Sequence, residues 1–196
     1  MVQQAIEVIE DGMEFLAVTG VEDRLQDHVL ETIEKFRDAG IQVWMLTGDK
    51  IETAKCIAIA TGMNHKSEKV HEIRGDQVVP RSLELKESID RYASTNRQKT
   101  MLMIDGIALA QIMADEPLCG RFFEAAAEAK SVCVCRCSPT QKALVARSIK
   151  AYTGKKIACV GDGGNDVAMI QEADVGLGIV GREGMQASLA ADFSLT

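Results

Sequence analysis

The sequence predicts an α/β fold built on a mostly parallel, doubly wound sheet, and three observations lead to that prediction. Short apolar runs alternate with stretches of helical periodicity along most of the 196 residues, an order typical of parallel sheets joined by helical crossovers. The run 157–160 is continuously apolar, as expected of a strand covered on both faces. The 46% hydrophobic content can fill one sizeable core, so residues 1–196 are expected to form a single domain.

Strands are predicted where a short apolar run ends at glycine or at a small polar turn. The clearest is 41–46, which runs into Thr47-Gly48-Asp49, and the run 100–104 ends at Asp105 in the same way. The predicted strands lie at 14–19, 41–46, 100–104, 132–135, 156–160 and 174–179.

Helices are predicted from apolar spacing and from capping residues. Asp27 is expected to cap a helix that Gly40 ends. Ser138 and Gln141 have the spacing of a capping box, and the helix they open is expected to end near Gly154. The predicted helices lie at 2–11, 28–39, 51–61, 83–92, 118–130, 139–153, 167–172 and 185–191.

Residues 63–99 are the least informative stretch of the chain. They carry many charges, and turn residues occur near Gly75 and Pro80. The stretch is interpreted either as a short strand followed by the helix at 83–92 or as a peripheral insert in the domain.

Composition excludes several classes of function. The net charge of −7 and the 4% aromatic content argue against a nucleic-acid surface, which needs clustered basic residues and stacking platforms. No apolar run approaches the ~18 residues that would span a bilayer, and the N-terminus has no signal-peptide core. A cytosolic location is expected, and Cys133, Cys135 and Cys137 alternate as buried strand residues do, which favours packing over a zinc site.

The stretch from Gly161 to Asp166 is the strongest chemical signal. It has three glycines in its first four residues, which allow close backbone approach to a bound group at the carboxyl end of a predicted strand. Asp162 and Asp166 would repel each other unless a cation lies near them, and Mg²⁺ shared with a phosphate is the cation that suits them. The alternative is a plain glycine–aspartate turn, which the pattern makes less attractive.

Three polar sets follow strand ends or open helices, and in one doubly wound sheet they would converge on a single crevice. Thr47 and the backbone after it are expected to hold phosphoryl oxygens, which Lys142 would neutralise as a point charge. Asp162 is expected to bind Mg²⁺, while Asn165 and Asp166 would hold the turn or an attacking group. Each of these three polar sets is common in proteins when it occurs alone. Their occurrence together and in this order predicts phosphoryl chemistry.

The same segments resemble the phosphorylation domain of P-type ATPases, which has a haloacid-dehalogenase-like (Rossmann-like) three-layer α/β/α fold. The matching motifs are Leu46-Thr47-Gly48-Asp49-Lys50, Ser138-Pro139-Thr140-Gln141-Lys142 and Val160-Gly161-Asp162-Gly163-Gly164-Asn165-Asp166. Two further stretches, 21–26 and 183–187, are similar to the phospholipid-flippase subfamily. The stretches 136–142, 163–166 and 186–194 resemble its Golgi and endosomal branch, which works without an accessory subunit. The resemblance covers 15–62 and 100–196.

The resemblance implies an ATP-driven phospholipid translocase whose cofactors are Mg²⁺ and ATP. It implies that Thr47, Gly48 and Asp49 contact phosphate and nucleotide and that Arg136 approaches the ribose. Lys142 would contact the phosphoryl group. Asp162 would bind Mg²⁺, and Asn165 and Asp166 would complete the site. The chain would then be a cytosolic domain of an integral protein of Golgi or endosomal membranes, and other parts of that protein would contact membrane and phospholipid.

The chain departs from the family at one decisive point, because the nucleophile motif Asp-Lys-Thr-Gly-Thr is absent. Asp105 lies at a strand end, but Lys-Thr-Gly does not follow it and it comes after Thr47, so it is not expected to act as the nucleophile. We therefore expect the C-terminal part of a phosphorylation domain, starting just after an inserted nucleotide-binding domain and inactive alone.

The missing motif also has a consequence for the sheet. The resemblance places the nucleophile's strand between the strand that ends at Thr47 and the strand that ends at Gly161. We expect the sheet to close by direct pairing across this gap, or a neighbouring segment or second chain to fill it. The chain would self-associate in the case where a second chain fills the gap.

Two other functions are compatible with the sequence. A free-standing phosphatase of the same fold needs a nucleophilic aspartate ahead of Thr47, where Asp11, Asp23 and Asp27 lack a strand-end context. A non-enzymatic phospho-receiver module also gathers Asp, Thr and Lys at strand ends. Receivers place their acidic pair early, however, whereas Gly161–Asp166 comes late in this chain.

Overall fold

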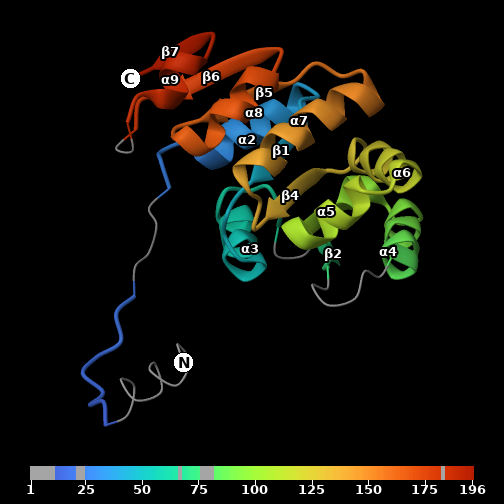
Figure 1. Ribbon diagram of the computed structural model, residues 1–196, viewed down its shortest axis with the longest axis horizontal. Helices are drawn as coiled ribbons and strands as arrows, with labels where there is room; N and C mark the ends of the chain where they lie inside the picture. Colours follow the sequence, from blue (N-terminus) through green and yellow to red (C-terminus); the bar gives the residue numbers. More distant parts are fainter. Residues whose placement is uncertain (1–11, 21–24, 66–67, 76–81, 182–183) are drawn as a thin grey trace, which may run out of the picture.

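The computed structural model describes residues 12–20, 25–65, 68–75, 82–181 and 184–196, and in these residues the strands form two parallel sheets (Figure 1). The first sheet has the order β1-β4-β3-β2, and the second has the order β5-β6-β7. The strands are β1 (Val43–Leu46), β2 (Lys69–Ile73), β3 (Thr100–Asp105), β4 (Ser131–Cys135), β5 (Ala158–Gly161), β6 (Val175–Ile179) and β7 (Phe193–Leu195). The parallel α/β fold class is confirmed, but the single sheet expected from the sequence is corrected to two.

Helices follow most strands, as the alternating pattern predicts. The helix α7 begins with the predicted capping box, in which Gln141 N donates to Ser138 Oγ (3.2 Å) and Ser138 N donates to Gln141 Oε1 (2.9 Å). It ends at Gly154, whose φ of 64° is left-handed. The helices are α2 (Val29–Asp38), α3 (Ile51–Ala60), α4 (Ser82–Ala93), α5 (Gly106–Met113), α6 (Glu116–Ala126), α7 (Pro139–Thr153), α8 (Val167–Glu172) and α9 (Gln186–Ala190). The helix α5 and the short strand β7 are not among the elements predicted from the sequence.

Two predictions at the N-terminal side are wrong, and a third lies outside the described residues. Residues 14–19 form no strand, and Leu16 is 87% exposed, because no other described strand pairs with this segment. Asp27 does not cap α2; His28 occupies that position in a left-handed conformation and makes no side-chain cap. The helix predicted at 2–11 falls outside the described residues.

Within 63–99, the structure shows a short strand followed by a helix. The strand β2 pairs in parallel with β3 and forms one edge of the first sheet, with Lys69 opposite Thr100 and Ile73 opposite Ile104. The helix α4 buries Leu85 against the main hydrophobic core, so both elements pack on the domain.

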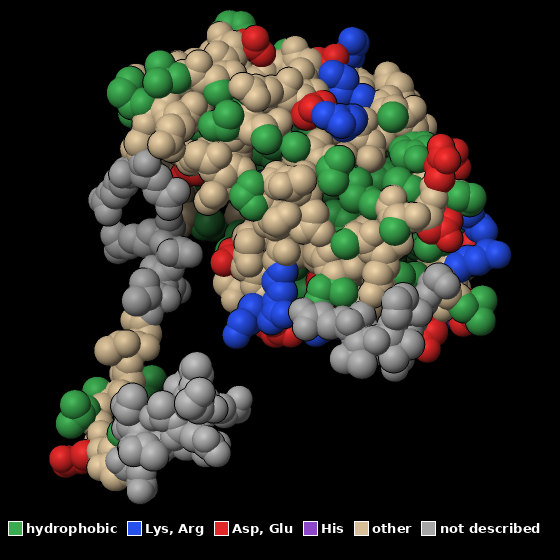
Figure 2. Space-filling view, viewed as in Figure 1, with side chains coloured by type: hydrophobic (Ala, Val, Ile, Leu, Met, Phe, Trp, Pro, Cys, Tyr) green, Lys and Arg blue, Asp and Glu red, His purple; other side chains and the backbone are tan. Residues whose placement is uncertain are grey.

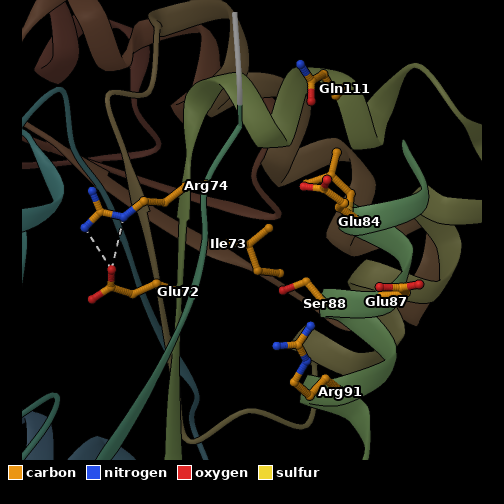
Figure 3. A pocket seen from close by; sticks show the side chains of 9 residues that line it. Glu72, Ile73, Arg74, Glu84, Glu87, Ser88, Arg91 and Gln111 are labelled. Carbon is orange, nitrogen blue, oxygen red and sulfur yellow. Dashed lines mark hydrogen bonds and ion pairs between the residues drawn. The ribbon is translucent and has the colours of Figure 1, made fainter. Parts of the chain in front are cut away.

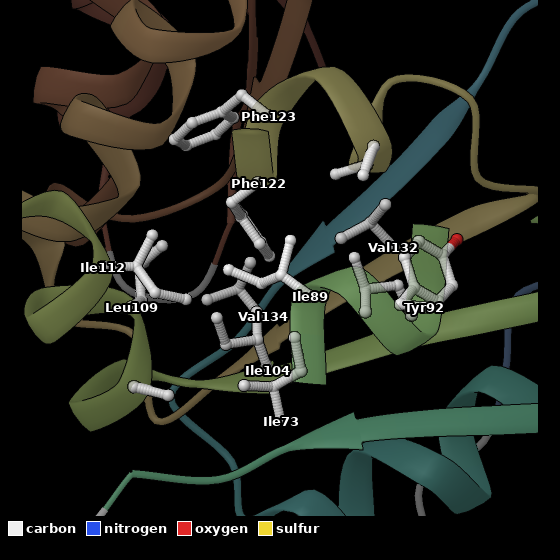
Figure 4. Packing of buried hydrophobic residues seen from close by; sticks show 14 of the residues in the cluster. Ile73, Ile89, Tyr92, Ile104, Leu109, Ile112, Phe122, Phe123, Val132 and Val134 are labelled. Atoms are coloured by element: carbon white, nitrogen blue, oxygen red, sulfur yellow. The ribbon is translucent and has the colours of Figure 1, made fainter. Parts of the chain in front are cut away.

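The first sheet is covered on both faces, which gives three layers. On one face, side chains of β3 and β4 pack against α4, α5, α6 and α7, and Phe122 and Phe123 of α6 are buried there (Figure 4). On the other face, Met103 and Cys133 pack against α3. The crossover helices supply these layers because each parallel connection must pass over a face of the sheet.

In the described chain, β1 and β5 do not pair with each other across the gap expected between them. Each of these strands is the last of its own sheet, so the predicted direct pairing across the gap is wrong. The expectation that both faces of β5 are buried is also wrong, since Val160 is 51% exposed. A continuous apolar run shows that a strand has apolar side chains on both faces. It does not show whether neighbouring elements cover both faces.

Asp174 fixes the start of β5 and supplies a pH-dependent contact. Its carboxylate accepts a hydrogen bond from Ile157 N (3.0 Å) and faces Lys156 Nζ (3.0 Å). The Ile157 hydrogen bond, followed by the one from Lys156, lowers the pKa of Asp174 to about 2. Because the folded-state pKa lies below the ordinary value of about 3.9, the stabilising contribution is full above pH ~4 and is lost as the pH falls toward 2.

We therefore expect Asp174→Asn to flatten the fall in melting temperature between pH ~4 and pH ~2. Thermal unfolding followed by circular dichroism across this range measures the effect. Asp38→Asn, the same change at an exposed helix end, is the control and should leave the slope unchanged. Parallel curves for the parent and Asp174→Asn would contradict the assignment.

Candidate functional site

The turn after β1 and the end of β4 are held together by backbone hydrogen bonds. Thr47 N donates to Val134 O, Cys137 N donates to Thr47 O, and Arg136 N donates to Asp49 O, each at 2.9 Å. The ladder between the two strands thus continues past their ends, which brings Arg136 beside the Thr47 turn. The Arg136 backbone has a φ of +50°, and its side chain is exposed.

The Thr47 turn presents polar groups to solvent. Thr47 Oγ1 donates to Asp49 Oδ2 (2.7 Å) and accepts from Asp49 N (3.1 Å), which closes a compact turn. Gly48 is exposed, and a Cβ added there would meet nothing within 4 Å. Among the described residues no group accepts a hydrogen bond from Gly48 N, so this N–H can donate to an anion.

Lys142 and Asp166 form the most buried ion pair of the predicted site. Lys142 Nζ donates to Asp166 Oδ1 at 2.8 Å, and the two side chains are only 14% and 11% exposed. The pair joins α7 to the turn after β5. Glycine is required at Gly161, because a Cβ there would lie 2.3 Å from the Asp166 Cβ.

Asp162 and Asn165 lie on the same turn and are exposed. No group of three or more His, Cys, Asp or Glu side chains that could hold a metal occurs in the part of the chain the structure describes. Mg²⁺ commonly uses one or two carboxylates, several waters and a substrate phosphate. Since Asp166 is already paired with Lys142, Asp162 is the carboxylate that fits a metal shared with a phosphate.

The predicted site residues are brought together in two groups. One contains the Thr47 turn and Arg136, and the other contains Lys142, Asp166 and the rest of the Gly161–Asp166 turn. The start of α7 links them, because Gln141 Nε2 donates to Gly106 O (2.6 Å) at the carboxyl end of the first sheet. Among the residues that the structure describes, no hydrogen bond joins Asp162 or Asn165 to the Thr47 turn.

Asp105 has a structural role. Its Oδ1 accepts hydrogen bonds from Ala108 N (2.8 Å) and Gly75 N (3.1 Å), and the residue is 9% exposed. Asp105 is the N-cap of α5. The aspartate just ahead of an apolar stretch is the signal that could have identified this helix from the sequence.

The strand cysteines are buried, as predicted. Cys133 and Cys135 are fully buried with their Sγ atoms 3.6 Å apart. Burial raises the pKa of the Cys137 thiol to about 11, and it raises the pKa of Cys159 to about 11 as well. The raised pKa values favour the protonated thiol at neutral pH.

A hollow of about 340 Å³ lies away from the predicted site, between β2, α4 and α5 (Figure 3). On its β2 side, Arg74 Nη2 pairs with Glu72 Oε2 at 2.8 Å. The lining residues are Glu72, Ile73, Arg74, Glu84, Leu85, Glu87, Ser88, Arg91 and Gln111. None of the predicted phosphate- or metal-binding residues lines it.

Comparison with known proteins gives consistent matches. The family of haloacid dehalogenase-like hydrolases matches residues 2–89. The phospholipid-transporting ATPase NEO1 of Saccharomyces cerevisiae is 46% identical over 196 residues, covering 100% of this chain and 16% of the relative. The probable phospholipid-transporting ATPase IIB of Homo sapiens is 44% identical over 195 residues, covering 100% of this chain and 16% of the relative.

The match is confined to a small part of each relative. The phospholipid-transporting ATPase neo1 of Schizosaccharomyces pombe is 45% identical over 189 residues, which is 95% of this chain and 17% of the relative. The chain thus spans about one sixth of the length of these proteins. In the described residues, no helix is both long and apolar enough to cross a membrane.

Proposed function

We propose that this chain, a haloacid dehalogenase-like domain, supplies the Mg²⁺- and phosphate-binding part of an ATP-driven phospholipid translocase. The premise is its match to the phosphorylation region of phospholipid-transporting P-type ATPases. The protein containing it would hydrolyse ATP through an aspartyl-phosphate whose carboxylate comes from outside this chain. The domain would face the cytosol at Golgi or endosomal membranes. Phospholipid and membrane would be contacted by other parts of that protein.

The Lys142–Asp166 pair is the observation that supports this proposal most directly. Phosphoryl transfer depends on fixed charges beside the transferred group. The 2.8 Å contact fixes the lysine ammonium beside the turn that carries Asp162, on a rigid helix start. In the bound state, Lys142 would offer its remaining N–H groups to phosphoryl oxygens while Asp166 keeps the ammonium in place.

The other polar groups divide the remaining tasks. Gly48 N–H and the Thr47 hydroxyl would bind phosphoryl oxygens, and Asp49 and Arg136 would orient the nucleotide from the neighbouring strand end. Asp162 would hold Mg²⁺, which when bound neutralises phosphate charge. Asn165 is exposed on the same turn and would donate a hydrogen bond to the phosphoryl group.

The chain alone is expected to form no acyl-phosphate and to hydrolyse no ATP. The nucleophile motif is absent, and Asp105 is held as a helix cap. Incubation with γ-labelled ATP and Mg²⁺, followed by acid precipitation, measures the label. The complete protein containing this chain should become labelled under the same conditions. Acid-stable label on the chain that disappears in Asp105→Asn would favour a free-standing phosphatase instead.

Binding of Mg²⁺ to the chain is expected to be weak and centred on Asp162. One free carboxylate gives a dissociation constant near 1 mM, an affinity of about −4 kcal/mol. Titration of ¹⁵N-labelled chain with MgCl₂ should shift amide signals of 161–166, and added inorganic phosphate should extend the shifts to Thr47 and Gly48.

The matched variants are Asp162→Asn, which should remove the Mg²⁺ shifts, and Asp38→Asn, which should leave them unchanged. Micromolar affinity, or shifts that centre away from residues 161–166, would contradict the assignment of Asp162.

A further inference from the structure

A group of sulfur-bearing side chains lies buried in the first sheet, and none of them belongs to the proposed phosphate site. On the face drawn in Figure 2, basic and acidic side chains lie next to one another, so that face offers a charged ligand no patch of one sign. Against α3, by contrast, six sulfur-bearing side chains pack in one hydrophobic cluster. We call this group the sulfur cluster; it comprises Met45, Met63, Met101, Met103, Cys133 and Cys135.

The strand register places three of these side chains in one row across the sheet. Met45 of β1 and Met103 of β3 are both paired with Cys133 of β4, so a methionine lies on each side of that cysteine. Side chains two positions apart on a strand point to the same face. Cys135 therefore lies next to Cys133, and the two Sγ atoms are 3.6 Å apart. Both cysteines and Met103 are fully buried.

Two sulfur atoms at this separation can bind one metal ion together. Metal–thiolate bonds are about 2.3 Å long, so an ion bound to both Sγ atoms at 3.6 Å would have a bent S–metal–S angle of about 100°. A bent pair of ligands leaves further coordination positions open. The thioethers of Met45 and Met103 flank Cys133 on the same face and can fill them. The cluster thus offers two thiolates and one or two thioethers.

The donor atoms select the class of ion. Thiolates and thioethers are soft ligands, and Cu(I) is an ion that they select. A structural zinc site uses four ligands from cysteine, histidine and carboxylates. Among the described residues, no group of three or more such side chains could hold a metal. Asp105, which lies opposite Cys135 on β3, already caps α5. The cluster therefore suits a soft monovalent ion better than Zn²⁺.

We propose that the sulfur cluster binds one Cu(I) ion, held by Cys133 and Cys135 and completed by a methionine thioether. Each cysteine that binds releases its thiol proton to solvent as the metal–sulfur bond forms. The strands β1, β4 and β3 pair directly with one another, so the cluster does not depend on a strand from outside this chain. Since both thiols are fully buried under α3, the ion must enter by local opening, and uptake should be slow.

Anaerobic titration with Cu(I), buffered by the chelator bicinchoninate, tests the proposal. The parent chain should take one equivalent of Cu(I) from the chelator, with thiolate-to-Cu(I) charge-transfer absorbance of the same stoichiometry. Cys133→Ala and Cys135→Ala should each weaken binding at least tenfold, about 1.4 kcal/mol. The matched controls are Cys119→Ala, at a buried cysteine of the other cluster, and Cys56→Ala, at the exposed one; both should bind like the parent. Unchanged circular dichroism spectra confirm that each variant folds.

A second measurement identifies the ligands without removing a cysteine. Met45→Leu and Met103→Leu replace each thioether with a side chain of similar volume, which cores tolerate well. X-ray absorption of the Cu(I)-loaded parent should show sulfur neighbours only, and combining both substitutions should reduce their number to the two cysteine sulfurs. An unchanged sulfur count would overturn the role of the thioethers.

Three results would overturn the site itself. The first is a parent chain that takes up no Cu(I) even after prolonged incubation. The second is Cu(I) binding that survives both Cys133→Ala and Cys135→Ala, or that is lost in Cys56→Ala, because the ion would then lie elsewhere. The third is tighter binding of Zn²⁺ than of Cu(I) by the same two cysteines, which would contradict the selection by soft ligands.

Discussion

Lys142→Met is expected to lower the free energy of unfolding by about 3 kcal/mol, the lower end for breaking a buried ion pair. Methionine keeps most of the apolar stem but leaves the Asp166 carboxylate, 11% exposed, without its ammonium partner at 2.8 Å. For a chain of this size the melting temperature should fall by roughly 6–12 °C. Urea unfolding followed by circular dichroism measures the free energy.

Two further variants separate the ion pair from a general effect of the substitution. Asp166→Asn added to Lys142→Met removes the unpaired charge and should recover part of the loss, giving a coupling energy of about 1–3 kcal/mol in a double-mutant cycle. Lys35→Met is the control, since Lys35 is 72% exposed in its pair with Glu31 and should change stability by less than about 1 kcal/mol. Equal small effects of Lys35→Met and Lys142→Met would contradict the structural role of the buried pair.

Phe123→Ala is expected to cost about 3–5 kcal/mol, because it empties the centre of the main core. Phe123 is fully buried, and its ring stacks on Trp44 (centroids 6.2 Å apart) and on Tyr152 (6.0 Å). It also meets Phe122 edge to face at 5.1 Å. The residue therefore joins β1, α6 and α7, and unfolding in urea should shift to lower denaturant with an unchanged slope.

The control for this prediction uses the same change at an exposed site. Phe15 is 79% exposed, so Phe15→Ala should leave the free energy of unfolding within about 0.5 kcal/mol of the parent. A loss below about 1 kcal/mol in Phe123→Ala would show that the Trp44–Phe123–Tyr152 stack does not hold these elements together.

Both variants act on the helix that carries the proposed phosphate-binding lysine. Lys142 lies in the first turn of α7 and Tyr152 lies in its last turns. The capping box fixes the start of this helix, and the aromatic stack fixes the part near its end. The position of the Lys142 ammonium is therefore determined by packing about three turns away as well as by Asp166.

The local parts of the site could be predicted from the sequence because short-range chemistry determines them. Ser138 and Gln141 form the predicted capping box, and the turns at Thr47 and at Gly161 follow the strands expected to precede them. The predicted burial of Cys133 and Cys135 is also found. In each case, the prediction depends only on residues within a few positions of one another.

Contacts between distant residues could not be predicted in the same way. The 2.8 Å contact between Lys142 and Asp166 depends on how α7 lies against the turn after β5. The role of Asp105 as a double acceptor depends on Gly75, thirty positions earlier. The residues next to Lys142 and Asp105 in the sequence do not indicate these partners, because the contacts form only when separate elements pack together.

The sequence by itself determined the parallel α/β class, the main alternating strands and helices, and the order of the motifs proposed to bind phosphate, because periodicity and turn chemistry are local. Only the tertiary structure decided that the strands divide into two sheets, that residues 14–19 remain unpaired, and that Val160 is half exposed. The physical reason is that a strand needs a partner for its backbone groups and a cover for its side chains, and both are supplied by elements distant in sequence.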